Sequence, residues 1–143
     1  MQKIIIYTDG GARGNPGPAG IGVQMLQGEK VVKEISEYIG EQTNNYAEYM
    51  ALIRALEEAQ KLFGTELRDM VVEVRMDSEL IVRQMQGVYK VKEPTLKELF
   101  AKVATLKMES VPNLTFAHVR REKNKRADEL VNAAIDTYFA KAT

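Results

Sequence analysis

The stretch Ile4–Gly11, which reads IIIYTDGG, decides the fold because an apolar run ends there on a carboxylate followed by two glycines. The run is β-branched and aromatic, and no polar residue interrupts it before Thr8. Such a segment is typical of a central strand that is buried on both faces. We therefore predict a strand over residues 3–8, with Asp9 at its carboxyl end.

The segments that follow indicate an α/β domain. Residues 10–20 are rich in glycine and proline and are typical of a turn. We predict further strands over residues 21–26, 30–38, 71–76 and 114–119. We predict helices over residues 43–63, 78–86, 94–108 and 124–140. Three consecutive strands favour an antiparallel meander, and the later alternation of strands and helices favours parallel additions. We expect a mixed five-stranded sheet with helices packed on its faces.

Composition places the chain among ordinary globular proteins. Its 143 residues, 45% of them hydrophobic and 28% charged, fit one domain over residues 1–143. The absence of cysteine excludes disulfides and thiolate metal ligands. No stretch approaches the ~20 apolar residues that span a bilayer, and the first apolar run is too short for a signal peptide. We therefore expect a soluble, cytoplasmic protein without a membrane partner.

The charge balance gives no general basic signal for nucleic-acid binding, because 20 basic residues face 20 acidic ones. One local cluster stands out. It consists of Arg120, Arg121, Lys123, Lys125 and Arg126. A solvated loop and helix start is the simpler interpretation of such a run, and contact with phosphate is the alternative.

Four acids lie where acids are unusual. Asp9 and Asp77 each end a strand, and parallel neighbours would bring both to one edge of the sheet. Glu48 falls on the same helical stripe as Leu52, Ala55, Leu56 and Ala59, and Asp128 on the same stripe as Val131, Ile135 and Tyr138. Buried acids are costly unless they are paired or bind a metal. Without thiols or a histidine cluster, the pattern predicts a carboxylate site for Mg²⁺ or Mn²⁺.

Each acid also has an ordinary interpretation. Asp77 could cap the next helix, and Asp9 could be a turn residue. Glu48 and Asp128 could lie near helix starts because the helix dipole favours acids there. Convergence of all four from separate segments favours the metal site over four independent roles.

Four motifs, in order along the chain, resemble those of type 1 ribonuclease H. They are YTDGG with GNPGPAG in residues 7–20, TNNYAE in 43–48, Asp77-Ser78, and NKRADEL in 124–130. The first two together are specific, and all four cover nearly the whole chain. The resemblance implies a ribonuclease H-like fold with strand order 3-2-1-4-5 and helices on both faces of the sheet.

The resemblance also implies an activity and a site. The activity is endonucleolytic hydrolysis of the RNA strand of RNA–DNA hybrids, leaving 3′-hydroxyl and 5′-phosphate ends. Separately, we expect the protein to be a monomer. The cofactor is a pair of Mg²⁺ ions, for which Mn²⁺ can substitute. The implied metal ligands are Asp9, Glu48, Asp77 and Asp128. The implied substrate contacts are Gly10, Gly11, Asn15, Thr43, Asn44, Asn45 and Ser78, with Thr43 at a phosphate of the DNA strand.

These substrate contacts have a physical rationale. Asparagine side chains can donate to and accept from the RNA 2′-hydroxyl, which distinguishes RNA from DNA. Glycines after Asp9 let the backbone approach nucleic acid closely. For residues 15–17 alone, a plain turn is the simpler interpretation.

The chain departs from the family pattern in three places. Residues 87–93 leave no room for the basic helical protrusion that many relatives have, so affinity must rest on contacts such as the basic cluster, Lys90 and Lys92. The loop 120–123 lacks the histidine of many relatives, and we expect His118 on the preceding strand to be structural. Glu41 and Glu93 stand where some relatives have arginine and asparagine, which places the DNA-phosphate pocket in question.

Two other functions compete with hybrid cleavage. A non-catalytic hybrid-binding module is disfavoured because four unneutralised carboxylates would repel phosphate. Another nuclease or a strand-transfer enzyme on the same fold is disfavoured by the short chain and by the motif in residues 43–45.

Overall fold

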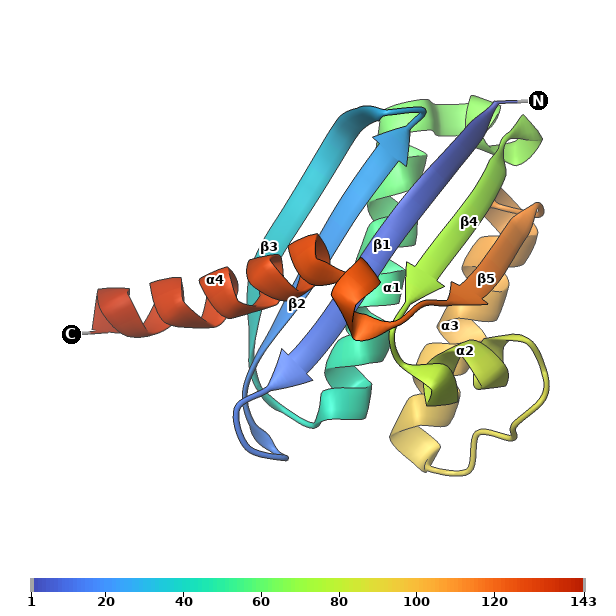
Figure 1. Cartoon of the computed structure of the whole chain (residues 1–143). Coiled ribbons are helices and arrows are strands. Elements are labelled where there is room, and N and C mark those ends of the chain that lie inside the picture. The colour runs from blue at the N-terminus through green and yellow to red at the C-terminus, as the bar shows by residue number, and fades with distance from the viewer. Residues whose placement is uncertain (1, 143) are drawn as a thin grey trace.

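The computed structural model describes residues 2–142 as one mixed sheet with helices on both faces (Figure 1). The strands are β1 (Lys3–Ala12), β2 (Gly17–Gln27), β3 (Lys30–Gln42), β4 (Val71–Met76) and β5 (Leu114–His118). The helices are α1 (Asn44–Phe63), α2 (Glu79–Met85), α3 (Pro94–Ser110) and α4 (Lys125–Ala142), with short 3₁₀ helices η1 (Gly64–Asp69) and η2 (Arg121–Lys123).

The strand order is β3-β2-β1-β4-β5, as the resemblance implied. β1 pairs antiparallel with β2, and β2 pairs antiparallel with β3. β4 lies parallel to β1, and β5 lies parallel to β4. The predicted meander with parallel additions is therefore confirmed.

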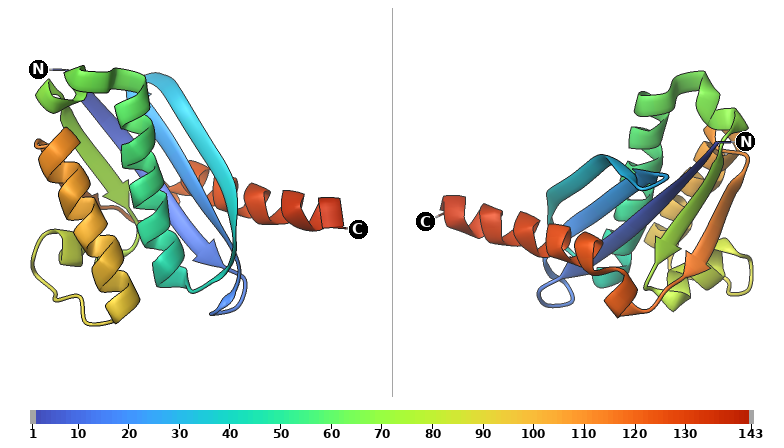
Figure 2. Two further views of the ribbon diagram at one scale, coloured as in Figure 1. Left: turned by 180° about the vertical axis from the view of Figure 1, so that it is seen from behind. Right: turned by 45° about the horizontal axis from the view of Figure 1, so that its top comes forward.

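The helices cover the two faces of the sheet unequally. Seen from behind, α1 and α3 lie across one face, with α2 beside the lower end of α3 (Figure 2). Among residues 2–142, α4 is the helix that covers the opposite face, where it crosses β2 and β3 and then extends past the sheet edge (Figures 1 and 2). No helix in this part of the chain is long and apolar enough to cross a membrane.

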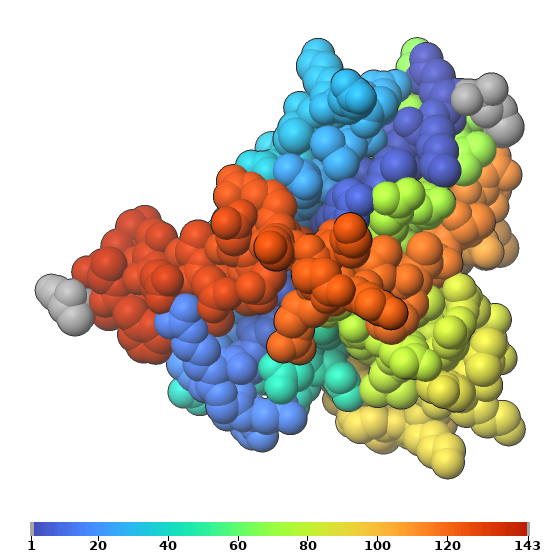
Figure 3. All heavy atoms as spheres, in the orientation of Figure 1, coloured from blue at the N-terminus to red at the C-terminus, as the bar shows by residue number. Residues whose placement is uncertain are grey.

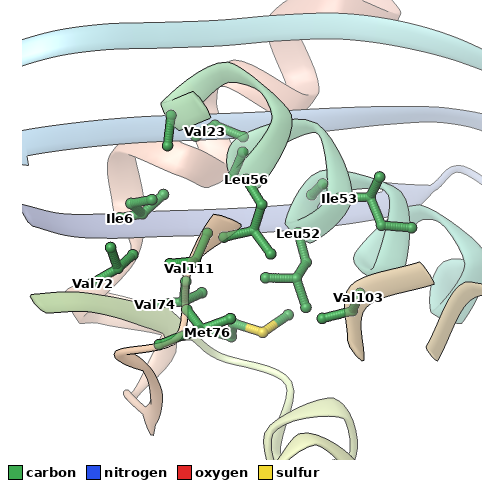
Figure 4. Packing of buried hydrophobic residues seen from close by; sticks show 14 of the residues in the cluster. Ile6, Val23, Leu52, Ile53, Leu56, Val72, Val74, Met76, Val103 and Val111 are labelled. Carbon is green, nitrogen blue, oxygen red and sulfur yellow. The ribbon is translucent and has the colours of Figure 1, made fainter. Parts of the chain in front are cut away.

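The main core lies between the sheet and the α1/α3 layer. Ile6 and Val74 on the sheet face Leu52 and Leu56 of α1, and Val103 of α3 closes the side of this cluster (Figure 4). These side chains are nearly or completely buried. β1 is central, as predicted, but it is fully buried on this face alone. The opposite face of its first half is only partly covered, because α4 crosses the sheet nearer the other end of β1.

The turn after β1 is shorter than the prediction. Gly10 pairs with Ile21 and Gly11 pairs with Gly20, so the β1–β2 ladder continues through residues that we expected to form a turn. Only residues 13–16 connect the strands, and the Asn15–Pro16 peptide bond is cis. The long ladder holds the end of β1 rigidly beside β2 and thereby positions Asp9.

The helix starts and ends follow local chemistry. Thr43 caps α1, its hydroxyl accepting a hydrogen bond from the Tyr46 amide, and Gly64 ends α1 with a positive φ of 57°. Ser78 caps α2 in the same way, accepting from the Ile81 amide. The carboxylate of Glu93 caps α3 by accepting from the amides of Thr95 and Leu96.

Candidate functional site

Three of the four predicted acids meet at one edge of the sheet. Asp9 is near the carboxyl end of β1, and Asp77 directly follows β4. Because β1 and β4 are parallel, with Thr8 opposite Met76, the two acids emerge side by side. Glu48 reaches them from the start of α1. One carboxylate oxygen from each of the three lies within 4.8 Å of the others, close enough for one metal ion to bind all three.

Gly10 makes this meeting possible because α1 packs directly on it. A Cβ atom at Gly10 would lie 2.2 Å from the carbonyl carbon and oxygen of Ala47 and 2.5 Å from the Glu48 nitrogen. The Gly10 amide also donates to Asp9 Oδ1 at 3.0 Å. The predicted contact of Gly10 with nucleic acid stays a prediction. In the fold, its missing side chain allows the close approach between β1 and α1 that brings Glu48 to Asp9.

The electrostatics of the cluster favour a bound cation. Burial, together with the neighbouring carboxylates of Asp77 and Asp128, raises the pKa of Asp9 to about 8. Burial and the charges of Asp9 and Asp77 raise the pKa of Glu48 well above its ordinary value. Glu48 Oε2 is buried and has no hydrogen-bond partner among the described residues. A metal ion would satisfy this oxygen and offset the repulsion between the acids.

Asp128 differs from the prediction in its burial. The buried stripe of α4 consists of Ala127, Leu130, Val131, Ala134 and Ile135. Asp128 lies beside this stripe and is exposed, and Tyr138 is 45% exposed. The stripe prediction was wrong for these two residues because α4 contacts the sheet along a narrower line than the pattern suggested. Asp128 nevertheless lines the same pocket as the other acids and helps to raise the pKa of Asp9.

Asn124 ties the acid cluster together. It is 1% exposed, and its Nδ2 donates to the Thr8 carbonyl at 2.9 Å and to Asp77 Oδ2 at 3.3 Å. Its own carbonyl accepts from the Asp128 amide at 3.2 Å. The sequence predicted Asn124 only as a helix start. A single residue thus links β1, Asp77 and the first turn of α4, which no local pattern could reveal.

The acids line a pocket of about 400 Å³. Its polar and glycine lining is Asp9, Gly10, Gly11, Arg13, Asn44, Glu48, Asp77, Arg121, Asp128 and Asn132. Arg121 is the member of the basic cluster that lines this pocket. Arg126 instead pairs with Glu34, to which its Nε and Nη2 each donate at 2.9 Å. In the free protein, therefore, Arg121 lines the acid pocket, whereas Arg126 is paired with an acid on the surface.

A second pocket of about 560 Å³ lies beside the start of α1. Its lining includes Asn15, Thr43, Asn45, Glu41 and Glu93. The predicted substrate contacts thus divide between two pockets, with Gly10, Gly11 and Asn44 on the acid side. Ser78 lines neither pocket, its hydroxyl caps α2, and its contact with substrate stays a prediction. His118 is exposed at the end of β5 and lines neither pocket.

Two hydrogen-bonded asparagines, here called the asparagine ridge, connect the linings of the two pockets, because Asn44 lines the acid pocket and Asn15 lines the second. The backbone N–H of Asn44 donates to Asn15 Oδ1 at 2.9 Å. The backbone N–H of Ala12 donates to Asn44 Oδ1 at 2.8 Å. Both side-chain oxygens accept from backbone N–H groups, and neither NH₂ group has a partner among residues 2–142, so both are available as donors.

Comparison with known proteins agrees with this architecture, an α/β sheet whose parallel strands end at a pocket of carboxylates. A family model described as "Reverse transcriptase-like" matches residues 7–134. Among solved structures, LC11-RNase H1, isolated from compost by a metagenomic approach, is 72% identical with a TM-score of 0.92, covering 97% of this chain and 99% of that one. LC11-RNase H1 is also known in complex with an RNA/DNA hybrid.

Curated relatives are more distant. Ribonuclease HI of Halobacterium salinarum is 38% identical over 94% of this chain and 65% of its own length. A bifunctional protein of Mycobacterium tuberculosis is 42% identical over 94% of this chain, which spans only 36% of that protein. The chain belongs to the type 1 ribonuclease H family.

Proposed function

We propose that this protein is an endoribonuclease that hydrolyses the RNA strand of RNA–DNA hybrids and leaves 3′-hydroxyl and 5′-phosphate ends. The observation that carries the proposal is the convergence of Asp9, Glu48, Asp77 and Asp128 in one pocket beside the Asn15–Asn44 ridge. The likeness to LC11-RNase H1, which binds a hybrid, supports the choice of substrate.

The proposed cofactor is a pair of Mg²⁺ ions, with Mn²⁺ as a substitute. Asp9, Glu48, Asp77 and Asp128 would hold them. The residues fit hard cations because the donor set is entirely carboxylate and one buried oxygen of Glu48 lacks a partner. When bound, the ions would supply an activated water at neutral pH and stabilise charge on the reacting phosphate.

The chain's own groups prepare the site for this chemistry. Gly10 N–H orients one oxygen of Asp9, and Asn124 orients one oxygen of Asp77. Such hydrogen bonds outside the ligand shell fix ligand orientation before a metal binds.

The asparagine ridge would select RNA. The free NH₂ groups of Asn15 and Asn44 can donate to a 2′-hydroxyl oxygen, which deoxyribose lacks. Their side-chain oxygens are already engaged by the backbone, so the amides are held in this donor orientation. The ridge would lie against the sugar edge of the RNA strand while the acid pocket holds its phosphate.

Arg121 would serve the pocket as a fixed positive charge. A guanidinium stays protonated at neutral pH, so Arg121 cannot accept a proton as the loop histidine of relatives is credited with doing. It can bind a phosphate oxygen and hold negative charge after cleavage. Glu41 and Glu93 line the second pocket without an arginine or lysine in its lining. Repulsion there would weaken contact with the DNA backbone.

A substrate panel tests the proposal. The protein is incubated with an RNA–DNA hybrid, double-stranded RNA, single-stranded RNA and duplex DNA, with Mg²⁺, with Mn²⁺ and with excess chelator. We expect cleavage of the hybrid that requires metal and is abolished in Asp9→Asn. The matched control is Asp69→Asn, which removes an exposed acid of η1 and should cleave like the wild type.

Four outcomes would contradict the proposal. Cleavage in excess chelator would exclude the metal site, and full activity of Asp9→Asn would exclude its role. Metal-independent hybrid binding without cleavage would indicate a binding module. Preference for duplex DNA would indicate a different nuclease. A cytoplasmic location and a monomeric state stay predictions.

A further inference from the structure

The β1–β2 turn places a cation in the acid pocket that the proposed reaction does not yet use. Arg13 lines this pocket and reaches across it to α4. Its Nη1 lies 2.8 Å from Asp136 Oδ1, and its Nη2 donates to Asn132 Oδ1 at 3.2 Å. In the space-filling view, the blue atoms of this turn rest against the red atoms of α4 (Figure 3).

The turn itself fixes the backbone of Arg13. Its amide donates to the Pro18 carbonyl at 2.8 Å. A Cβ atom at Gly17 would lie 2.2 Å from the Arg13 carbonyl oxygen, which shows how closely the turn folds around this residue. The start of the Arg13 side chain is therefore held at the pocket whether or not Asp136 is present.

The ion pair with Asp136 is open to water. The Arg13 side chain is 44% exposed and that of Asp136 is 66% exposed. Exposed pairs of this kind contribute little to stability, so another anion can readily replace the carboxylate. A phosphate is well suited, because the planar guanidinium binds two of its oxygens at once.

We propose that Arg13 binds a phosphate of the RNA strand adjacent to the one that is cleaved, and that the Asp136 carboxylate occupies the place of this phosphate in the free protein. The proposal rests on the proposed function. Arg13 and Arg121 enter the pocket from different segments, the turn after β1 and η2. Once cations neutralise the four acids, these two arginines make the pocket attractive to consecutive phosphates. Asp136 then acts as a built-in competitor of the substrate.

A purely structural role makes a different prediction. If the Arg13–Asp136 pair only fastened the turn to α4, removing either partner would impair the protein in the same direction. If Asp136 competes with phosphate, the two substitutions act in opposite directions. Arg13→Gln should raise KM for the hybrid about 3- to 10-fold, the loss of one charge-assisted contact, with kcat changed less than twofold. Asp136→Asn should lower KM.

The experiment measures steady-state cleavage of a hybrid and, separately, its binding by fluorescence anisotropy across a series of salt concentrations. Arg13→Gln should reduce the slope of log Kd against log salt by about one phosphate contact. The double variant should behave like Arg13→Gln, because Asp136 has no effect without its arginine. Lys61→Gln is the control, since it removes an exposed cation near the far end of α1.

The outcomes are distinct. Wild-type KM and salt slope in Arg13→Gln, or a raised KM in Asp136→Asn, would overturn the Arg13 proposal while leaving hybrid cleavage intact. Binding that depends on Arg13 without any cleavage by the wild type would overturn the proposed function alone. Thermal unfolding of each variant shows whether a changed KM comes from damage to the fold.

Discussion

Asn124 donates to Asp77 Oδ2 at 3.3 Å from the same amide nitrogen that donates to the Thr8 carbonyl at 2.9 Å. The carboxylate of Asp77 is therefore held relative to β1, the strand that carries Asp9. The four acids come from β1, α1, the end of β4 and α4, so their mutual positions depend on links of this kind.

We predict that Asn124→Ala weakens metal binding. Loss of a hydrogen bond that orients a ligand typically costs about 10- to 100-fold in metal affinity or activity. The measurement is the metal concentration that gives half-maximal cleavage. Asn113→Ala is the control, because Asn113 donates to the Arg68 carbonyl at the other end of β5. An unchanged metal requirement in Asn124→Ala would show that Asp77 binds the metal without the hydrogen bond from Asn124.

Gly10→Ala should damage the fold where Gly11→Ala does not. A Cβ at Gly10 would lie 2.2 Å from the Ala47 backbone, whereas the nearest atom to a Cβ at Gly11 is 3.8 Å away. Overpacking of this kind costs about 1–3 kcal/mol, and here the obstacle is backbone that cannot rotate aside. Urea unfolding of both variants checks the prediction. Equal stability of the two would mean that α1 can move off β1 without cost.

Metal affinity should rise with pH. The pKa of Asp9 is raised to about 8, so protons compete with the metal for this ligand at neutral pH. Between pH 6 and pH 8 we expect the apparent affinity to increase by up to about tenfold per pH unit for each proton that the acids release on metal binding. Isothermal titration with Mn²⁺ across this range is the measurement. A flat profile would show that Asp9 is already ionised in the free protein.

The metal-free protein should lose stability as pH rises. Asp9 has a higher pKa in the folded chain than in the unfolded chain, so between about pH 4 and pH 8 the folded state binds more protons. Asp9→Asn removes this loss. In chelator at pH 8.5 its Tm should exceed that of the wild type, by roughly 2–4 °C for each kcal/mol gained. A lower Tm would show that the carboxylate of Asp9 stabilises the fold.

Substitutions within the basic cluster should differ in their effect on kcat. Arg121→Gln should reduce kcat, because Arg121 lines the acid pocket. Arg126→Gln should leave kcat unchanged, because Arg126 is engaged by Glu34 and Glu129 on the surface. Steady-state kinetics on one hybrid compare the two. Equal losses would indicate that the cluster acts on substrate as a whole.

The sequence predicted the strands and helices well where local chemistry decides them. The bounds of β4 and α1 match the prediction because valine-rich alternation, the Thr43 cap and the Gly64 stop are local signals. The sequence did not predict that β1 continues through Gly10 and Gly11. Glycines in isolation are typical of a turn, and only the pairing with β2 shows that these two belong to a strand.

The candidate site shows the same division. Periodicity indicated that Glu48 lies on an inward-facing stripe but placed Asp128 too far inward, since a pattern does not give the width of a helix contact. The partners of Arg126 and Asn124 lie 92 and 116 residues away in the chain, and no local pattern encodes such separations. Arg13 was overlooked because a single arginine in a turn carries no pattern at all.

The close packing of α4 on β2 determines when Asp128 joins the other three acids during folding. A Cβ at Gly22 of β2 would lie 2.1 Å from the Ala127 carbonyl oxygen, so the helix backbone rests directly on the strand. During synthesis, which runs from the N-terminus, Asp9, Glu48 and Asp77 exist before Asp128 does. Until α4 docks on Gly22, Asp128 is absent from the acid pocket, so the full set of four acids forms only after the last helix of the chain is in place.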